Sequence, residues 1–259
     1  MQPSLCIMVT RPDPGGAELC ELIQAQGDIP LHFPTIEFAP PQDVSAFEQT
    51  IKQLGQQDWL LFVSPQAVRA SVPAIRRAWP QFPASVQFAA VGAGTAKALE
   101  QAGYRVNCLP DSEWSSEGLL DSDEFQAIED QHVAVIRGEG GREILEKILE
   151  DRGAEVISVV AYERARPEVD TRPYLALLGD GKIDAIVCTS FEGVSNLKQL
   201  IGEAGWPALK QVPLIVVSER IKALAWDAGF QTIWVATNAS HEAILAVIAQ
   251  IRNKLCQSR

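Results

Sequence analysis

The chain repeats itself at a fixed spacing, and this duplication constrains its fold more than any other feature. Residues 131–166 repeat the opening feature for feature: an apolar run ending in arginine, a Gly-Gly pair, an amphipathic stretch, a glycine and a second apolar run. Arg137 follows Arg11 by 137 − 11 = 126 positions, and Gly153 follows Gly27 by 153 − 27 = 126. The same offset relates Asp58 to Asp184, Ser64 to Ser190, Val91 to Val217 and Gly103 to Gly229. Self-similarity over this length predicts two homologous lobes rather than a solenoid.

Apolar runs typical of strands alternate with amphipathic runs typical of helices in both copies. We expect strands at 5–9, 29–33, 59–63, 86–91 and 104–108, and again at 133–136, 156–160, 183–188, 214–217 and 232–235. Such alternation predicts an α/β protein with parallel sheets that helices cover on both faces.

Two proline-marked segments indicate where the chain crosses between lobes. They are the Pro-Pro pair at 40–41 and the stretch 164–173, and domain boundaries favour such exposed linkers. We therefore expect lobe 1 to comprise 1–40 with 166–259, and lobe 2 to comprise 41–165. A contiguous division at the junction between the copies is the simpler alternative.

Charge and cysteine usage exclude several classes of protein. The 259 residues carry a net charge of −11 with a pI near 4.8, which argues against binding nucleic acid or an anionic membrane. The five cysteines are scattered without a C-x-x-C spacing, and the three histidines are dispersed, so neither a disulfide framework nor a metal site is expected. With no long apolar run and no signal sequence, we expect a cytoplasmic protein whose mature chain begins near Met1.

Candidate binding residues follow from the architecture. In open α/β sheets, ligands bind beyond the carboxyl ends of the strands, at the point where the strand order reverses. This rule selects Thr10, Arg11, Thr189, Ser190, Ser218 and Arg220 in lobe 1, and Ser64, Thr95, Ser116 and Arg137 in lobe 2. Hydroxyl groups, arginine side chains and helix N-termini can bind carboxylates or phosphates, because they present hydrogen-bond donors and positive charge to the anion. Two such rims facing one another would clamp a large polyanion.

Each choice also has a structural alternative. Ser and Thr after strands are commonly helix N-caps, which applies to Ser64, Thr95 and Ser190. Arg137 and Arg142 could be ion-pair partners, and Tyr162 could be a half-buried residue at the edge of a sheet.

The chain resembles the uroporphyrinogen-III synthase family in segments spread over nearly its whole length. They are VTRP (9–12), FVSPQAV (62–68), AVGAGTAKALEQAGY (90–104), SSEGLL (115–120), RGEGGREIL (137–145), VAYER (160–164), TSFEGVSNL (189–197) and VVSERIKALAWDAGF (216–230). Two positions depart mildly from the pattern of the family. Gly94 stands before Thr95 where other residues are common, and Ser-Glu-Arg at 218–220 replaces the glycine-threonine version seen in the first copy. The resemblance implies two similar flavodoxin-like lobes with parallel sheets, joined by a two-stranded hinge, no cofactor and a monomer.

The resemblance also implies an activity, the cyclisation of hydroxymethylbilane with loss of water and inversion of ring D. It implies Tyr162 as the general acid that assists departure of the hydroxyl. The substrate's acetate and propionate groups would be bound by Thr10, Ser64, Thr95, Ser116, Thr189, Ser190 and Ser218, with Arg11, Arg137, Arg142 and Arg220 neutralising their charge.

Two other functions stay open at this point. One is a non-catalytic, two-lobed small-ligand binding or sensor protein that closes without turnover. The other is a nucleotide-dependent transferase, which the absence of a phosphate-binding loop disfavours. The sequence also leaves open whether the preceding enzyme of the pathway hands over its unstable product by direct contact.

Overall fold

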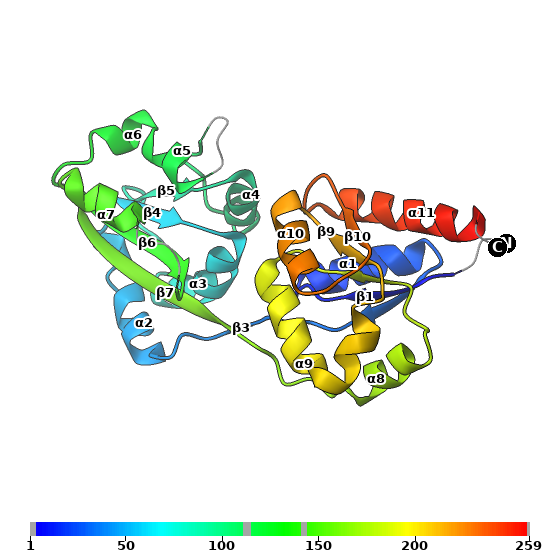
Figure 1. Cartoon of the computed structure of the whole chain (residues 1–259). Coiled ribbons are helices and arrows are strands. Elements are labelled where there is room, and N and C mark those ends of the chain that lie inside the picture. Colours follow the sequence, from blue (N-terminus) through cyan, green and yellow to red (C-terminus); the bar gives the residue numbers. More distant parts are fainter. Residues whose placement is uncertain (1–3, 111–114, 141–143, 258–259) are drawn as a thin grey trace. The chain divides into compact units, whose positions relative to one another are not determined.

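The computed structural model describes residues 4–110, 115–140 and 144–257, and it divides into two compact units (Figure 1). Lobe 1 comprises Met1–Glu37 and Ala165–Arg259, and lobe 2 comprises Phe38–Arg164. The sequence-based boundaries at 40/41 and 165/166 lie close to these crossings. Arg142 lies outside the described residues.

Lobe 1 is built on a parallel five-stranded sheet. Its order is β10 (Ile233–Val235), β9 (Leu214–Val216), β8 (Ala185–Val187), β1 (Cys6–Val9) and β2 (Ile29–His32). Numbered along the chain within this lobe, the order is 2-1-3-4-5, the doubly wound order of flavodoxin-like folds. The strand order therefore reverses between β1 and β8.

Helices cover both faces of this sheet, as the alternating pattern predicts (Figure 1). One face packs on α1 (Gly15–Ala25) and α11 (His241–Gln257), and the other on α8 (Arg172–Gly179), α9 (Phe191–Leu209) and α10 (Glu219–Asp227). Within β1, Ile7 and Val9 belong to the first core and Met8 to the second. This follows from the alternation of side chains along a strand.

Lobe 2 repeats the arrangement in a second five-stranded sheet, which gains β3 (Glu37–Ala39) at one edge and, in its described residues, has no counterpart of β10 at the other. Its order is β3, β7 (Glu155–Ala165), β6 (His132–Gly138), β4 (Trp59–Phe62) and β5 (Gln87–Ala90). β3 is not among the strands expected from the apolar pattern, although the resemblance implies a hinge of two strands. It ends before the Pro-Pro pair, which has no backbone N–H to donate. The chain thus passes between the lobes through two neighbouring strands, β3 and the end of β7.

The strand expected at 104–108 is reduced to one parallel bridge between Cys108 and Ala89. The side chain of Asn107 explains the difference, because its Oδ1 accepts the backbone N–H of Phe88 at 3.0 Å and takes the place of a strand carbonyl. The equivalent position in lobe 1 is Ile233, which has no competing side-chain acceptor and begins β10.

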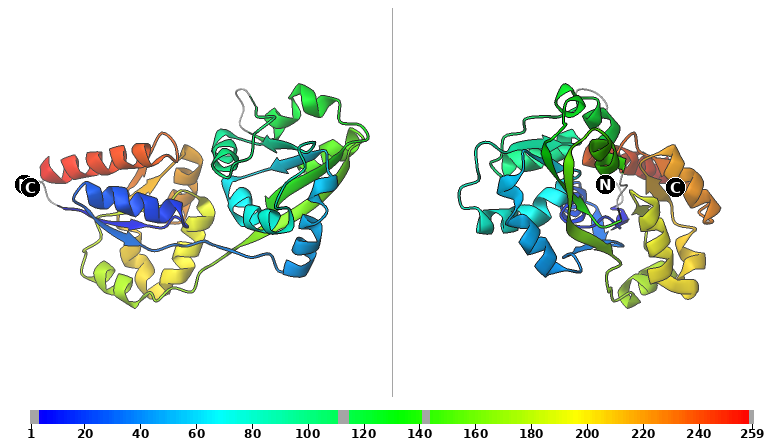
Figure 2. Two further views of the ribbon diagram at one scale, coloured as in Figure 1. Left: turned by 180° about the vertical axis from the view of Figure 1, so that it is seen from behind. Right: turned by 90° about the vertical axis from the view of Figure 1, so that its left-hand side faces the viewer.

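Two cores flank the sheet of lobe 2. One contains α2 (Val44–Ile51), the short 3-10 turn Leu54–Gln56, α3 (Pro65–Ala78) and α4 (Ala93–Gln101), and the other contains α5 (Ser116–Leu120), α6 (Asp123–Gln126) and α7 (Ile144–Asp151). In Figure 2 the green helices lie on the opposite side of the strands from cyan α3. On β4, Leu60 and Phe62 are fully buried toward α3 and Leu61 toward α7. Each such side chain contributes about 1.5–3 kcal/mol on burial.

The duplication extends to individual hydrogen bonds. Asp58 accepts the backbone N–H of His132 at 2.8 Å, and Asp184, 126 positions later, accepts that of Cys6 at 2.8 Å. In both cases a carboxylate of one copy binds a strand of the other. Each sheet therefore combines strands from both copies of the repeat.

Candidate functional site

A pocket of about 400 Å³ opens at the carboxyl ends of β4, β6 and β7 in lobe 2. Residues from these strand ends, from the loops that follow them and from the first turns of α5 and α7 line it. They are Val63, Ser64, Val91, Ser115, Ser116, Glu117, Arg137, Gly138, Glu139, Gly140, Leu145, Glu146, Tyr162 and Arg164. The pocket thus brings Ser64, Ser116, Arg137 and Tyr162 of the sequence-predicted site together.

A β-bulge turns Tyr162 toward this pocket. Arg137 on β6 pairs with Val160, but Gly138 pairs with Tyr162, so Ala161 is the extra residue on β7. A bulge shifts the alternation of the strand by one position, and both Ala161 and Tyr162 consequently face the core that contains α3. Without the bulge, the phenol would point to the other face of the sheet.

Three neighbours fix the ring of Tyr162, which is only 4% exposed. The ring of Phe38 meets it edge to face, with centroids 5.3 Å apart. A Cβ built on Gly138 would lie 2.5 Å from its Cζ, so the ring rests directly against the glycine backbone. Its hydroxyl lies 3.2 Å from Ser64 Oγ, in a hydrogen bond that either atom can donate. The alternative of a half-buried edge residue does not describe this position.

Helix N-termini supply the hydroxyls of the pocket. Ser64 is the N-cap of α3, and its Oγ accepts the backbone N–H of Ala67 at 3.1 Å. Ser115 caps the short helix α5 through Gly118 N–H at 3.0 Å, and Ser116 is the first residue of that helix. Ser64 and Ser116 therefore both line the pocket, and capping occupies one of the two acceptor positions of Ser64 Oγ.

Arg137 forms a buried ion pair. It is 7% exposed, and its Nη1 lies 2.5 Å from Oε1 of Glu146, which is 8% exposed and also accepts from Ser158 Oγ at 3.4 Å. The ion-pair alternative for Arg137 thus describes what the structure contains, although the pair is buried. The sequence interpretation missed Glu146. It could have been found as a charged residue that lies with Leu145 and Leu149 on the buried face of α7.

Arg11 stands at the corresponding position of lobe 1, at the end of β1. Its Nη1 donates to the carbonyl oxygen of Ala239 at 3.2 Å, and no described carboxylate lies within ion-pair distance of it. Burial lowers the pKa of the Arg11 guanidinium below its usual value, and the negative charge of Glu18 acts in the opposite direction. A half-buried cation of this kind is stabilised by a ligand anion.

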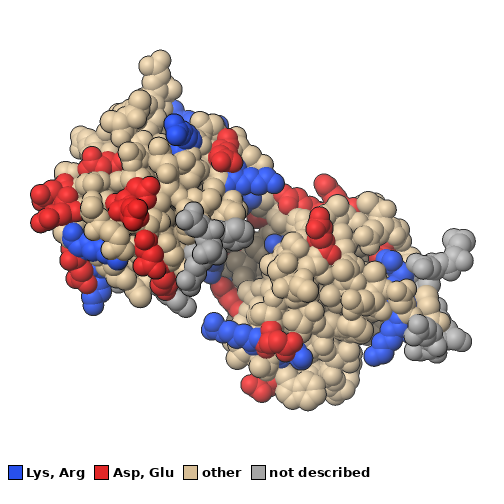
Figure 3. Space-filling view, turned by 90° about the horizontal axis from the view of Figure 1, so that it is seen from above, with Lys and Arg blue, Asp and Glu red and all other residues tan. Residues whose placement is uncertain are grey.

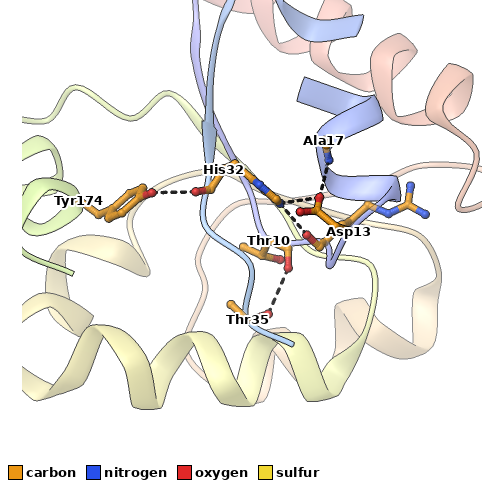
Figure 4. A network of polar contacts seen from close by, with 7 residues as sticks. Thr10, Asp13, Ala17, His32, Thr35 and Tyr174 are labelled. Atoms are coloured by element: carbon orange, nitrogen blue, oxygen red, sulfur yellow. Dashed lines mark hydrogen bonds and ion pairs between the residues drawn. The ribbon is translucent and has the colours of Figure 1, made fainter. Parts of the chain in front are cut away.

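Polar contacts hold the loop around Arg11 in place (Figure 4). His32 Nε2 donates to the carbonyl oxygen of Arg11 at 3.0 Å and lies 3.7 Å from Asp13 Oδ1, which accepts from Ala17 N–H. Tyr174 donates to the carbonyl oxygen of His32 at 2.7 Å. The sequence interpretation considered His32 only as a metal ligand and excluded that role because the histidines are dispersed; its contact with a residue 21 positions away appears only in the fold.

The remaining lobe 1 candidates have mixed roles. Thr10 is 2% exposed and donates to the carbonyl oxygen of Val187 at 2.8 Å. Ser190 and Ser218 are the N-caps of α9 and α10, accepting from Gly193 and Ile221 N–H at 3.0 and 3.3 Å. Thr189 is half-buried after β8, and Arg220 is exposed on α10.

Thr95 was a candidate for both capping and binding. It lies in the first turn of α4, is 3% exposed, and the N-cap of this helix is Gly92 instead. Thr95 is not among the described residues that line the pocket.

Charge is distributed without a basic face in the view of Figure 3, where Lys and Arg are interspersed with Asp and Glu on both lobes. Among the described residues, no group of three or more His, Cys, Asp or Glu could hold a metal ion. None of the described helices is long and apolar enough to cross a membrane.

The sequence matches the model of the family described as uroporphyrinogen-III synthase HemD over residues 17–246. The uroporphyrinogen-III synthase of Escherichia coli (strain K12) is 34% identical over 250 residues, which cover 94% of this chain and 100% of that protein. That of Salmonella typhimurium is 32% identical over 248 residues, with 94% and 100% covered.

Solved structures show the same fold. A mutant uroporphyrinogen III synthase from the extremely thermophilic bacterium Thermus thermophilus superimposes with a TM-score of 0.60 at 20% identity, covering 97% of this chain and 100% of the other. The uroporphyrinogen-III synthetase of Helicobacter pylori 26695 gives a TM-score of 0.59 at 16% identity, with 96% and 100% covered.

Proposed function

The chain belongs to the uroporphyrinogen-III synthase family, and we propose that the pocket around Tyr162 is where it cyclises hydroxymethylbilane to uroporphyrinogen III. The activity is that of a hydro-lyase of tetrapyrrole biosynthesis. The observation that supports the placement is a buried tyrosine that lines a pocket at the strand ends and whose hydroxyl contacts the Oγ of Ser64, another lining residue. As part of the same proposal, the enzyme acts as a cytoplasmic monomer.

In this proposal Tyr162 is the general acid for loss of the terminal hydroxyl. Its proton passes to the departing oxygen, which leaves as water with the electron pair of the C–O bond. The pyrrole nitrogen supplies electrons to the carbon, giving an azafulvenium cation. The substituted carbon of ring D attacks this cation, and the resulting spiro intermediate fragments and recloses with ring D reversed.

Positioning decides which isomer forms. Without an enzyme, the same electrophile closes at the free carbon of ring D and gives the isomer with that ring unreversed. A pocket of about 400 Å³ lies near the lower end of the ~300–1,000 Å³ range of small-molecule sites, so it suits one end of an open-chain tetrapyrrole. Holding the reacting end in one orientation removes the competing closure from reach.

We propose that Arg11 binds a carboxylate group of the substrate. It is a half-buried cation without a described carboxylate partner, whereas Glu146 already offsets the charge of Arg137. Arg11→Met should therefore raise KM more than Arg137→Met does when each is corrected for loss of folded protein. Equal effects would contradict this ranking.

The test supplies hydroxymethylbilane and separates the two product isomers by chromatography. The native protein should form the ring-reversed isomer, whereas a ligand-binding protein would leave only the spontaneous isomer. Tyr162→Phe should lower kcat roughly ten- to a hundredfold, at or below the low end of the ~10²–10⁴ range of general acid catalysis. Tyr104→Phe is the matched control, because Tyr104 stacks on Phe88 in the core of the same lobe. Equal rates for both variants would remove Tyr162 from the mechanism.

A further inference from the structure

We propose that Ser64 is a positioning residue for Tyr162: its hydroxyl accepts a hydrogen bond from the phenol in the resting enzyme and donates one to the phenolate oxygen during the reaction. This rests on the proposed function, in which Tyr162 gives up a proton. It assigns to Ser64 an action on the acid, in addition to its position among the residues that line the pocket.

Ser64 can exchange donor and acceptor roles without disturbing the helix that it caps. A hydroxyl has one proton and two acceptor positions. One acceptor position of Ser64 Oγ is occupied by the N–H of Ala67 at 3.1 Å, and its second contact is Tyr162 Oη at 3.2 Å. The proton of Ser64 has no other acceptor among the described residues, so it is available to Tyr162.

The two oxygens are held from independent sides. The backbone of Ser64 is extended, with φ −159° and ψ 157°, and the cap bond fixes its side chain on the first turn of α3. The ring of Tyr162 is held by Gly138 beneath it and by Phe38 at its edge. The contact between the oxygens is therefore set by the fold of lobe 2 and is present before substrate binds.

Comparison of the two copies shows that the helix cap does not require the contact with tyrosine. Ser190 occupies the equivalent position in lobe 1 and makes the equivalent cap to Gly193. The position equivalent to Tyr162 is 162 − 126 = 36, and residue 36 is a buried isoleucine. Both copies thus keep the cap, and within the described part of the chain only the cap in lobe 2 has a phenol against it.

The hydrogen bond strengthens where the reaction requires it. When Tyr162 transfers its proton to the departing hydroxyl, water leaves and the phenol becomes a phenolate, which can only accept. Ser64 then donates to it, and a hydrogen bond to a charged oxygen is roughly twice as strong as a neutral one. Because the gain arises in the transition state, it raises kcat with little change in KM. The phenolate regains a proton when ring closure releases one from a pyrrole carbon, so no net charge is left on the enzyme.

A double-mutant cycle tests the coupling. Ser64→Ala should lower kcat roughly tenfold, with KM changed less than about twofold. In the Tyr162→Phe background, the same substitution should lower kcat less than about twofold, since the oxygen through which Ser64 acts is absent. The loss in Ser64→Ala should also not exceed the loss in Tyr162→Phe.

Asp43→Ala is the control for the lost cap. Asp43 caps α2 in the same lobe through Ala46 N–H at 2.8 Å and lies outside the residues that line the pocket. It should lose stability comparable to that lost by Ser64→Ala in urea unfolding and retain the native kcat.

Two further variants keep the cap and separate donation from capping. Ser64→Thr retains a hydroxyl and should keep kcat within about threefold. Ser64→Asp retains an acceptor for the cap but has no proton to donate when ionised, and it should be at least as slow as Ser64→Ala.

Three results would overturn the inference and leave the proposed function standing. They are an equal loss from Ser64→Ala in both tyrosine backgrounds, a native kcat in Ser64→Asp, and a loss in Asp43→Ala that matches that of Ser64→Ala. If the native protein formed only the unreversed isomer, the proposed function would fail and the inference with it.

Discussion

Gly138 is the residue on which the placement of Tyr162 depends, and Gly138→Ala tests this directly. The added Cβ would lie 2.5 Å from Tyr162 Cζ, 2.7 Å from Cε2 and 2.9 Å from Oη. Carbon atoms in favourable contact are about 3.5 Å apart, so the ring must move by about 1 Å. The Ser64–Tyr162 distance of 3.2 Å leaves little room for this shift, because a separation near 3.6 Å is no longer a hydrogen bond.

The expected cost has two parts of opposite sign. Inserting a methyl group into a packed core lowers the free energy of unfolding by about 1–3 kcal/mol. Replacing glycine by alanine within a strand raises it by about 0.5–1 kcal/mol, because less backbone entropy is lost on folding. We therefore expect a net loss of about 0.5–2 kcal/mol in the free energy of unfolding. A misplacement of about 1 Å can reduce a rate by as much as a hundredfold, so kcat should fall by about ten- to a hundredfold.

The measurement combines urea unfolding with the rate and isomer composition of the product from hydroxymethylbilane. Gly94→Ala is the matched control, because a Cβ there would meet only Pro65 Cγ, at 3.5 Å, and lies within helix α4. That variant should gain about 0.5–1 kcal/mol and keep its activity. If Gly138→Ala were as stable and as active as Gly94→Ala, the contact between Gly138 and Tyr162 could not be what positions the phenol.

Three further predictions concern buried charges and a thiol. Arg137→Met alone should lower the free energy of unfolding, measured in urea, by about 3–5 kcal/mol, because it leaves the buried Glu146 carboxylate unpaired. Arg137→Met combined with Glu146→Leu should stay within about 1–2 kcal/mol of the native protein. Equal losses in the two variants would contradict the buried pair. Arg252→Met should destabilise the protein by about 3 kcal/mol, since it leaves the buried carboxylate of Asp28 without its cation; an unchanged midpoint of unfolding would refute this. Burial, and secondarily the negative charge of Asp13, raises the pKa of Cys20 to about 11. The rate of its alkylation by iodoacetamide, followed by peptide mass spectrometry, should therefore rise about tenfold per pH unit from pH 8 to 10. A rate that levels off by about pH 9.5 would contradict the raised pKa.

Features that depend on neighbouring residues could be predicted from the sequence. Ser64 and Ser190 each follow a buried strand and begin a helix, as hydroxyl residues in this position commonly do. Each accepts the backbone N–H of the residue three positions later. Gly27 and Gly153 have positive φ values of 85° and 89°, as expected of glycines that follow helices. Local hydrogen bonding and backbone preference suffice to determine these features, and the constant offset between the copies made each of them visible twice.

What remained undecided were contacts between residues far apart in the chain. Ser64 and Tyr162 are 98 positions apart, and their meeting requires both the pairing of β4 with β6 and the one-residue bulge on β7. Whether Arg137 was free or paired depended on α7 turning Glu146 inward. A shift of one residue in a strand moves a side chain to the opposite face of its sheet, so only the tertiary structure could decide these contacts. The sequence by itself determined two copies of an α/β unit and the ends of their strands; the tertiary structure decided which of those ends carries a buried phenol.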